Sequence, residues 1–402
     1  MTPGGNEAKP ARRGRGDPLR HERRVTVSPR AVNARCCKRT SFWKTTAKFW
    51  RNVEIAGVSP NAIVLYVSSR KRIQTRIVFT EKGKVALSEF PSEPLAEGAV
   101  RLRSLYSLMS TGTETTCFSG NFEPGTGWDA WVKYPFFPGY ALVGEVAELG
   151  PGATTLRVGQ VVVSRCGHAS EHVKPESECY PVPSGMDPKL MSWFALAKIA
   201  AMGARAAAHR LGESVVVIGA GPVGQMAVRW AAATGPEHLL VVDTVEKRLE
   251  MAMHGGATLG IAKPIEGAQA EITAALGGGQ PDLVIDATGN SLVFRSALRT
   301  ARHRGRVLLL GDTGHPDQQH MVQELVVRGL TLVGAHDGNE DEQWNTPRIL
   351  RLFFRLVRDG MFRLDGLITH EFRPQQCAEA YALAAFRRPE TMGILFDWRT
   401  EP

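Results

Sequence analysis

Hydrophobic and polar residues alternate along residues 75–90 on both sides of Lys82-Gly83. This pattern is typical of two strands that are joined by a tight turn. Strand patterns continue over 99–112 and 137–164, where Gly- and Pro-containing turns separate short Val- and Leu-rich segments. We therefore expect an antiparallel β domain of short strands up to about residue 185.

The hydrophobic period changes at about Pro188. Residues 188–211 are Ala-rich with helical spacing, and residues 214–235 have the pattern of a strand, a glycine turn and a helix. Further apolar strands, separated by helical stretches, follow at 238–243, 282–289 and 306–314. Strands and helices that alternate in this way predict an α/β domain with a doubly wound parallel sheet. The chain ends with helical patterns at 345–360 and 375–386 and a final strand at 392–398.

Residues 1–72 have no sustained hydrophobic period and are rich in arginine. Residues 1–76 hold 18 Lys and Arg against four acidic residues, whereas 77–402 hold 31 against 36, so the formal net charge of +9 comes from the N-terminal segment. We predict a basic, disordered extension over 1–72. A nucleic-acid-binding arm, an organelle-targeting peptide and a misassigned start codon remain open for it. The mildly acidic body gives no reason to expect a nucleic-acid partner.

The six cysteines include no C-x-x-C pair and no framework typical of a small disulfide-rich domain. Reduced thiols in a cytoplasmic protein are therefore expected. No apolar stretch follows the basic N-terminus as in a secretory signal. No window reaches the roughly 18 apolar residues of a membrane span, so we expect no membrane partner.

A glycine motif, GAGPVG at 219–224, lies between an apolar strand and a helix. In this position Gly219 permits a tight turn, Gly221 lets backbone N–H groups approach a pyrophosphate, and Gly224 lets the helix pack closely on the strand. Asp243 ends the next strand, 19 residues after Gly224, where its carboxylate can accept hydrogen bonds from ribose hydroxyls. The motif predicts a dinucleotide site.

The order of these segments resembles the medium-chain dehydrogenase/reductase superfamily over about residues 76–402. The motifs that carry the resemblance are VIGAGPVG, VVD, DATG, LLLGDTG, LVGA and LITHEFRPQQCAEAY. It implies a GroES-like, β-rich catalytic domain over 73–190 that is completed by 338–402, a Rossmann domain over 191–337, and an active site in the cleft. Residues 110–114 and 392–398 look most like the branch that contains 2-desacetyl-2-hydroxyethyl bacteriochlorophyllide a dehydrogenase.

Three groups of residues are expected to bind the cofactor: the glycine motif with Asp243, small residues at the ends of later strands, and Arg248. The resemblance places Arg248 at a position whose side chain often stacks on adenine in the family. The predicted cofactor-binding residues are Gly219, Gly221, Pro222, Val223, Gly224, Asp243, Arg248, Thr288, Gly289 and Gly311. We expect NAD as the cofactor, because the Asp243 carboxylate would repel the 2′-phosphate of NADP.

Many members of the superfamily hold a catalytic zinc, whereas this chain has Thr111 and Tyr140 at the positions of two ligands. A hydroxyl and a phenol are poor substitutes for the thiolate and imidazole that zinc prefers. The four-cysteine lobe of a structural zinc is also missing, so we predict no metal. A side chain, a ribose hydroxyl of the cofactor or a water molecule must then handle the proton. The candidates are Thr111, Tyr140 and Lys198, although Thr111 and Tyr140 also suit a packing role and Lys198 a solvated helix face.

These observations predict a zinc-independent, NAD-dependent oxidoreductase that interconverts a secondary alcohol and a ketone. Its small-molecule substrate is expected to be bulky or a secondary metabolite. Two alternatives remain open: an NADPH-dependent enoyl or quinone reductase of the same superfamily, and a non-catalytic dinucleotide-binding protein. The resemblance also implies a homodimer or homotetramer that associates through an edge strand at 330–335.

Overall fold

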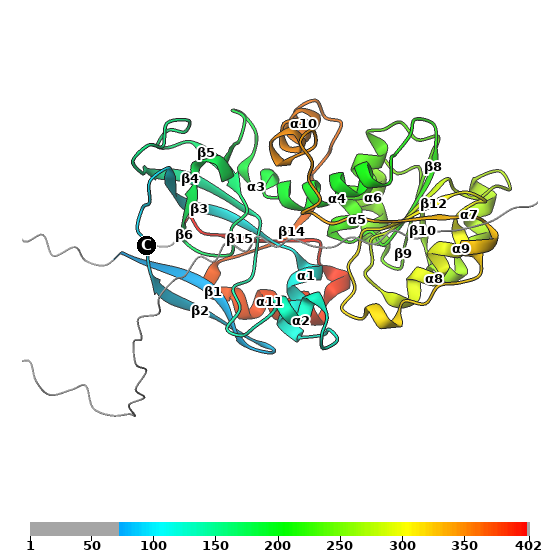
Figure 1. Ribbon diagram of the computed structural model, residues 1–402, viewed down its shortest axis with the longest axis horizontal. Helices are drawn as coiled ribbons and strands as arrows, with labels where there is room; N and C mark the ends of the chain where they lie inside the picture. The colour runs from blue at the N-terminus through cyan, green and yellow to red at the C-terminus, as the bar shows by residue number, and fades with distance from the viewer. Residues whose placement is uncertain (1–71, 400–402) are drawn as a thin grey trace, which may run out of the picture. The chain divides into compact units, whose positions relative to one another are not determined.

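The structure, a computed structural model, describes residues 72–399. The predicted disordered extension therefore lies outside the described residues, except for Arg72. Two large sheets form separate groups of strands in the ribbon (Figure 1). Among the described helices, none combines the length and apolar character that a membrane crossing requires.

The first two strands form the predicted hairpin. Strands β1 (Ile73–Glu81) and β2 (Lys84–Pro91) pair antiparallel around Lys82-Gly83. Gly83 has φ +73°, in the left-handed region that glycine adopts without a steric cost. The alternation of apolar and polar residues in the sequence therefore identified this hairpin correctly.

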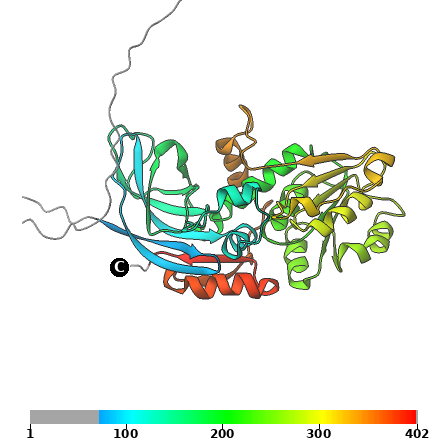
Figure 2. The ribbon, with the colours of Figure 1, turned by 60° about the horizontal axis from the view of Figure 1, so that its bottom comes forward.

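A seven-stranded sheet follows, in the order β14-β15-β3-β4-β5-β7, with β6 paired to β3. Its strands are β3 (Ala99–Met109), β4 (Leu142–Leu149), β5 (Val161–Ser164), β6 (Glu171–Pro175), β7 (Tyr180–Pro181), β14 (Ile368–Phe372) and β15 (Gly393–Asp397). The C-terminal strand β15 runs antiparallel to β3, so segments that are far apart in the chain build one sheet. Helix α11 (Cys377–Phe386) packs against β2, as the red helix beside the blue strands in Figure 2 shows.

The second sheet is wholly parallel and has the strand order β10-β9-β8-β11-β12-β13. Its strands are β8 (Ser214–Ile218), β9 (His238–Asp243), β10 (Leu259–Ala262), β11 (Leu283–Asp286), β12 (Arg306–Leu309) and β13 (Thr331–Gly334). This is the Rossmann order, in which the chain reverses direction across the sheet between β8 and β11. The predicted fold class is confirmed, and β13 is the edge strand that the sequence placed at 330–335.

Helices connect these strands and cover them. They are α1 (Thr111–Ser119), α2 (Gly127–Trp131), α3 (Pro188–Met191), α4 (Phe194–Ala206), α5 (Pro222–Ala232), α6 (Glu246–His254), α7 (Gln269–Ala275), α8 (Ser291–Thr300), α9 (Glu324–Val327) and α10 (Thr346–Arg358). The domain limits 73–190, 191–337 and 338–402 stay predictions.

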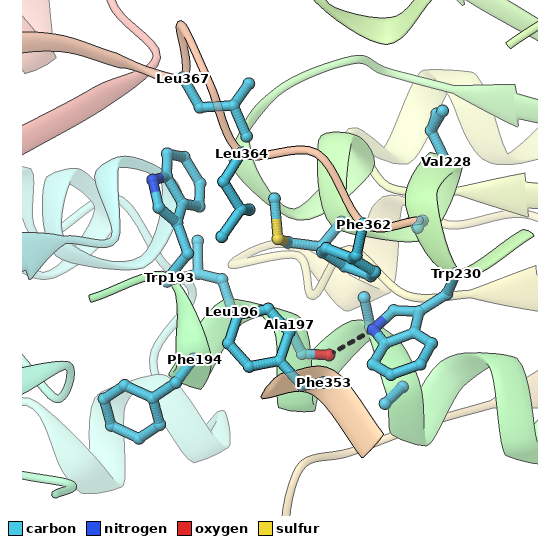
Figure 3. Packing of buried hydrophobic residues seen from close by; sticks show 14 of the residues in the cluster. Trp193, Phe194, Leu196, Ala197, Val228, Trp230, Phe353, Phe362, Leu364 and Leu367 are labelled. Carbon is cyan, nitrogen blue, oxygen red and sulfur yellow. Dashed lines mark hydrogen bonds between the residues drawn. The ribbon is translucent and has the colours of Figure 1, made fainter. Parts of the chain in front are cut away.

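A large aromatic core joins α4, α5 and α10 (Figure 3). Trp193, Phe353 and Phe362 are fully buried in it. Trp230 of α5 donates its indole N–H to the carbonyl oxygen of Ala197 on α4 at 2.8 Å, which satisfies the polar atom of a buried ring. This packing fixes α4, and hence Lys198, relative to the parallel sheet.

Candidate active site

The glycine motif forms the connection between β8 and α5. Gly219 has φ +89°, and a Cβ atom there would lie 2.7 Å from Cγ2 of Thr288. A Cβ on Gly224 would lie 1.9 Å from the carbonyl oxygen of Gly219. Both positions therefore require glycine for reasons internal to the protein.

Gly221 is different, because the protein itself does not require glycine there. Its φ of −67° and ψ of −175° suit any residue, and no heavy atom of the described structure beyond its chain neighbours lies within 4 Å of a Cβ built on it. Pro222 and Val223 then begin α5, with Pro222 in the first helical turn. Open space in front of a helix N-terminus suits a phosphate group, which the N–H groups and the helix dipole attract.

Asp243, the last residue of β9, holds this loop in place. One carboxylate oxygen accepts the N–H of Ala220 at 2.7 Å, and the other accepts the N–H of Val245 at 2.9 Å. A carboxylate offers about four acceptor positions, so Asp243 keeps capacity for ribose hydroxyls. Arg248 on α6 donates to the carbonyl oxygen of Arg388 at 2.5 Å, and burial lowers the pKa of its guanidinium.

The remaining predicted cofactor residues lie in the loops after β11 and β12. A Cβ on Gly289 would lie 2.5 Å from the carbonyl oxygen of Asp312, and a Cβ on Gly311 would lie 2.3 Å from the nitrogen of Gly289. These glycines let the two loops pack against each other, while Thr288 packs against Gly219. The loops after β8, β11 and β12 therefore meet at the carboxyl edge of the sheet, where ligands of this fold bind.

A cluster of hydroxyl groups forms at the start of α1. Ser110 precedes this helix and does not cap it with its side chain, so its Oγ is available to accept a hydrogen bond from the Tyr140 hydroxyl at 2.5 Å. Thr113 also bonds to Tyr140, and Thr111 is buried in the first helical turn. Burial raises the pKa of the Tyr140 hydroxyl, although the bonds to Ser110 and Thr113 oppose this effect.

Charged side chains extend from this cluster to the parallel sheet. The Arg165 guanidinium lies 4.5 Å from the centre of the Tyr140 ring and pairs with Asp337 at 2.5 Å. Asp337 follows the edge strand β13 and also pairs with Lys198 at 2.9 Å. Lys198 pairs in addition with Glu340 at 2.5 Å. Lys198 is therefore linked to Tyr140 through Asp337 and Arg165, rather than by direct contact with the hydroxyl cluster.

The sequence did not identify Arg165 and Asp337 as site residues. Arg165 follows β5 without any motif that marks it. For Asp337 a signal existed, because it is a polar residue just after a strand of a parallel sheet, where the carboxyl edge lies. Among the predicted catalytic residues, the structure places Tyr140 in the hydroxyl cluster and Thr111 in the first turn of the adjoining helix, whereas Lys198 is connected to Tyr140 through two ion pairs and the contact of Arg165 with the Tyr140 ring.

A second, deeper network lies behind the hydroxyl cluster. Glu114 is 1% exposed, and its carboxylate accepts hydrogen bonds from the Ser110 N–H at 2.8 Å and the Tyr381 hydroxyl at 2.5 Å. Its second oxygen also contacts Nε2 of His168 at 3.0 Å, and Nδ1 of His168 bonds to Ser107 at 2.7 Å. The carboxylate and imidazole nearest to Tyr140 are thus bonded within the core.

The residues present do not fit a zinc ion. Within residues 72–399, no three His, Cys, Asp or Glu side chains gather in a way that could hold a metal. Burial raises the pKa of the Cys117 thiol to about 12 and that of Cys166 to about 11.

Two family models match the chain: the alcohol dehydrogenase GroES-like domain over residues 108–207 and the zinc-binding dehydrogenase domain over 222–353. The chain belongs to the medium-chain dehydrogenase/reductase superfamily. It is an oxidoreductase of the alcohol dehydrogenase type. The branch suggested by residues 110–114 and 392–398 stays a prediction.

Similar curated proteins include L-threonine 3-dehydrogenases. That of Bacillus licheniformis is 28% identical over 290 residues, which covers 64% of this chain and 82% of the relative. That of Symbiobacterium thermophilum is also 28% identical, over 64% of this chain and 81% of the relative. Dehydrogenases of this superfamily act on small molecules.

Solved structures share the fold at low sequence identity. An oxidoreductase of unknown specificity from Escherichia coli has a TM-score of 0.71 at 18% identity, with 81% of this chain and 99% of the other covered. The 2R,3R-butanediol dehydrogenase of Bacillus subtilis has a TM-score of 0.68 at 18% identity, with the same coverage. One similar Escherichia coli structure contains NADH and one from Sinorhizobium meliloti contains NADP, with TM-scores of 0.68 and 0.67.

Proposed function

We propose that this superfamily member is a zinc-independent, NAD-dependent oxidoreductase that interconverts a secondary alcohol and a ketone. The observation that carries the proposal is the chain of contacts from Tyr140 through Arg165 to Asp337. It joins an ionisable hydroxyl to the carboxyl edge of the parallel sheet, where the open space at Gly221 suits a dinucleotide.

A bound nicotinamide supplies or accepts the hydride in this chemistry. The chain must supply the group that moves the proton of the alcohol oxygen. Tyr140 is suited to that task, because its hydroxyl can donate a proton to a ketone oxygen and its phenolate can accept one from an alcohol. Ser110 holds the hydroxyl in place by accepting its hydrogen bond at 2.5 Å.

Zinc independence rests on the donor groups. Thr111 and Tyr140 replace two ligand positions with oxygen donors that zinc disfavours at neutral pH. Glu114 and His168 bond to each other and to further core groups, so neither is free to replace them. No step of the proposed reaction therefore involves a metal.

The preference for NAD rests on Asp243 and Arg248. Two backbone N–H groups hold the Asp243 carboxylate at the end of β9, where it would face the 2′-position of the adenosine ribose. Arg248 already donates to a main-chain carbonyl oxygen, which competes with any role in binding a 2′-phosphate. The local charge therefore favours a ribose hydroxyl over a phosphate.

A bulky substrate is supported by the aromatic residues of α2. Trp131 is 53% exposed, and its ring centre lies 5.8 Å from that of Trp128. Exposed aromatic rings are able to cover an apolar substrate, and we propose this role for α2. Association as a homodimer or homotetramer and a cytoplasmic location remain predictions.

The test is the oxidation of a panel of secondary alcohols by the wild-type protein and by Tyr140→Phe and Thr111→Val. Loss of the proton-transfer group should lower kcat by about 10²-fold or more in Tyr140→Phe, with NADH affinity unchanged. Thr111→Val should lower kcat less. Tyr134→Phe is the matched control, because it also removes one hydroxyl hydrogen bond, the one to the Cys117 carbonyl oxygen at 2.6 Å.

Metal analysis of the dialysed protein accompanies the kinetics. We expect far less than one zinc per chain and no effect of a chelator on turnover. One zinc per chain, together with activity that a chelator removes and zinc restores, would contradict zinc independence. A Tyr140→Phe variant with wild-type kcat would contradict the role of Tyr140.

A further inference from the structure

Arg165 has an unusual position between the two sheets. It follows β5 of the seven-stranded sheet, and its guanidinium lies over the Tyr140 ring, with 4.5 Å between its central carbon and the ring centre. One of its terminal nitrogens contacts Asp337, which comes from the loop after β13 of the parallel sheet, at 2.5 Å. The side chain of Arg165 is 35% exposed, whereas that of Asp337 is 16% exposed.

We propose that Arg165 is a positioning residue for Tyr140, and that Asp337 sets how strongly the Arg165 charge acts on the Tyr140 hydroxyl. This inference rests on the proposed function, because it concerns the same hydroxyl. It adds that a residue of the parallel sheet affects the reacting group. Asp337, in the loop after β13, determines how much positive charge Arg165 presents to the Tyr140 hydroxyl.

The contacts around Tyr140 give the direction of this control. The positive charge of Arg165 stabilises the phenolate, whereas the buried negative charge of Glu114 on α1 opposes it. The Ser110 and Thr113 hydroxyls can donate hydrogen bonds to the phenolate once the proton has left, and in that way they also favour ionisation. Arg165 is therefore the one cation among these described neighbours, and its partner Asp337 decides how far its charge is neutralised.

Asp337 itself is shared between two cations. Its second carboxylate oxygen lies 2.9 Å from Nζ of Lys198, and its carbonyl oxygen accepts a hydrogen bond from the same group at 2.8 Å. Glu340 pairs with Lys198 from the other side at 2.5 Å. Lys198 is 6% exposed on α4, which the aromatic core holds in place. Lys198 of α4 thus holds Asp337 in the position in which it pairs with Arg165.

Two substitutions should shift the Tyr140 ionisation in opposite directions. Arg165→Met removes the cation, so the phenolate becomes less stable. Asp337→Asn leaves Arg165 and Lys198 less neutralised, so the phenolate becomes more stable. General damage to the site lowers activity in both variants and produces no such opposition of sign.

The experiment measures kcat for oxidation of a secondary alcohol from the panel against pH, at saturating NAD. We expect the rising limb of the profile to move up by about one pH unit in Arg165→Met and to move down in Asp337→Asn. Arg165→Lys retains the charge and should lie between Arg165→Met and the wild type. The matched control is Arg103→Met, which breaks an exposed pair with Glu145 and should leave the limb in place.

NADH affinity is measured for each variant as a check that the fold is intact. Limbs that stay in place, or that move the same way in Arg165→Met and Asp337→Asn, overturn the inference. If Tyr140→Phe itself keeps the wild-type limb, the proposed function fails instead. A defective Tyr140→Phe together with wild-type behaviour of Arg165→Met overturns only the role of Arg165.

Discussion

Two glycines of the GAGPVG motif should respond in opposite ways to the same substitution. At Gly221 a Cβ would enter open space, and the backbone angles of −67° and −175° suit alanine. At Gly224 a Cβ would lie 1.9 Å from the carbonyl oxygen of Gly219. The fold should therefore accept Gly221→Ala and resist Gly224→Ala.

The magnitudes follow from these positions. Replacing glycine by alanine at an unstrained site raises the free energy of unfolding by about 0.4–1 kcal/mol, because the unfolded chain loses conformational freedom. Gly221→Ala should show this small gain. Gly224→Ala forces β8 and α5 apart and should cost about 3 kcal/mol, the upper end of the range for overpacking.

NADH binding, in contrast to stability, should be impaired by Gly221→Ala. A methyl group in the space over the loop keeps a pyrophosphate from approaching the backbone N–H groups. We expect at least a tenfold loss of NADH affinity in Gly221→Ala, or about 1.4 kcal/mol. Gly221→Ala should therefore be slightly more stable than the wild type and yet bind the dinucleotide poorly.

The assay combines NADH fluorescence titration with urea unfolding of each variant. Gly267→Ala is the matched control, because a Cβ there also enters open space but lies in the short helical turn after β10, outside the GAGPVG motif. Its NADH affinity should equal that of the wild type. Wild-type NADH affinity in Gly221→Ala would refute the reasoning, since the space over Gly221 would then not be where the dinucleotide lies.

We predict that stability depends on pH through Asp286. Burial raises the pKa of its carboxyl group to about 6. The folded state therefore binds more protons than the unfolded state between about pH 4 and 6. Stability should fall by up to about 3 kcal/mol as the pH rises through this window, and Asp286→Asn should remove the fall. Urea unfolding from pH 4 to 7.5 checks this, and parallel curves for the two proteins would contradict it. Asp243→Ser should narrow the preference for NAD in paired NADH and NADPH titrations, whereas tighter binding of NADPH by the wild type would exclude that preference.

Local spacing in the sequence predicted the fold class, whereas the cofactor-binding residues that it suggested stay predictions. The hairpin at β1 and β2 and the order of strands and helices after residue 188 follow from hydrophobic periods of two and 3.6 residues, which depend on neighbours in the chain. The steric demands of Gly219 and Gly224 likewise arise within one strand, turn and helix. Such features need no knowledge of distant segments.

The charge control of Tyr140 could not be predicted in this way. Arg165 and Asp337 are 172 residues apart in the chain, and only the meeting of the two sheets makes them partners. The resemblance placed Tyr140 at a former ligand position but gave no account of what surrounds it. Lys198 forms ion pairs with Asp337 and Glu340 that the sequence did not indicate, and its role as a proton carrier stays a prediction.

The surroundings of Tyr140 and the position of His168 belong to one network of contacts. A Cβ on Gly139 would lie 2.7 Å from the His168 ring, so the imidazole packs directly against the backbone next to Tyr140. There it bonds to Glu114, whose carboxylate also accepts the Ser110 N–H and so fixes the residue that receives the Tyr140 hydrogen bond. An acid and an imidazole of the kind that hold metals in proteins thus support a hydroxyl instead. We therefore predict that Tyr140→His alone would not create a zinc site, because the His168 imidazole and the Glu114 carboxylate already bond to each other.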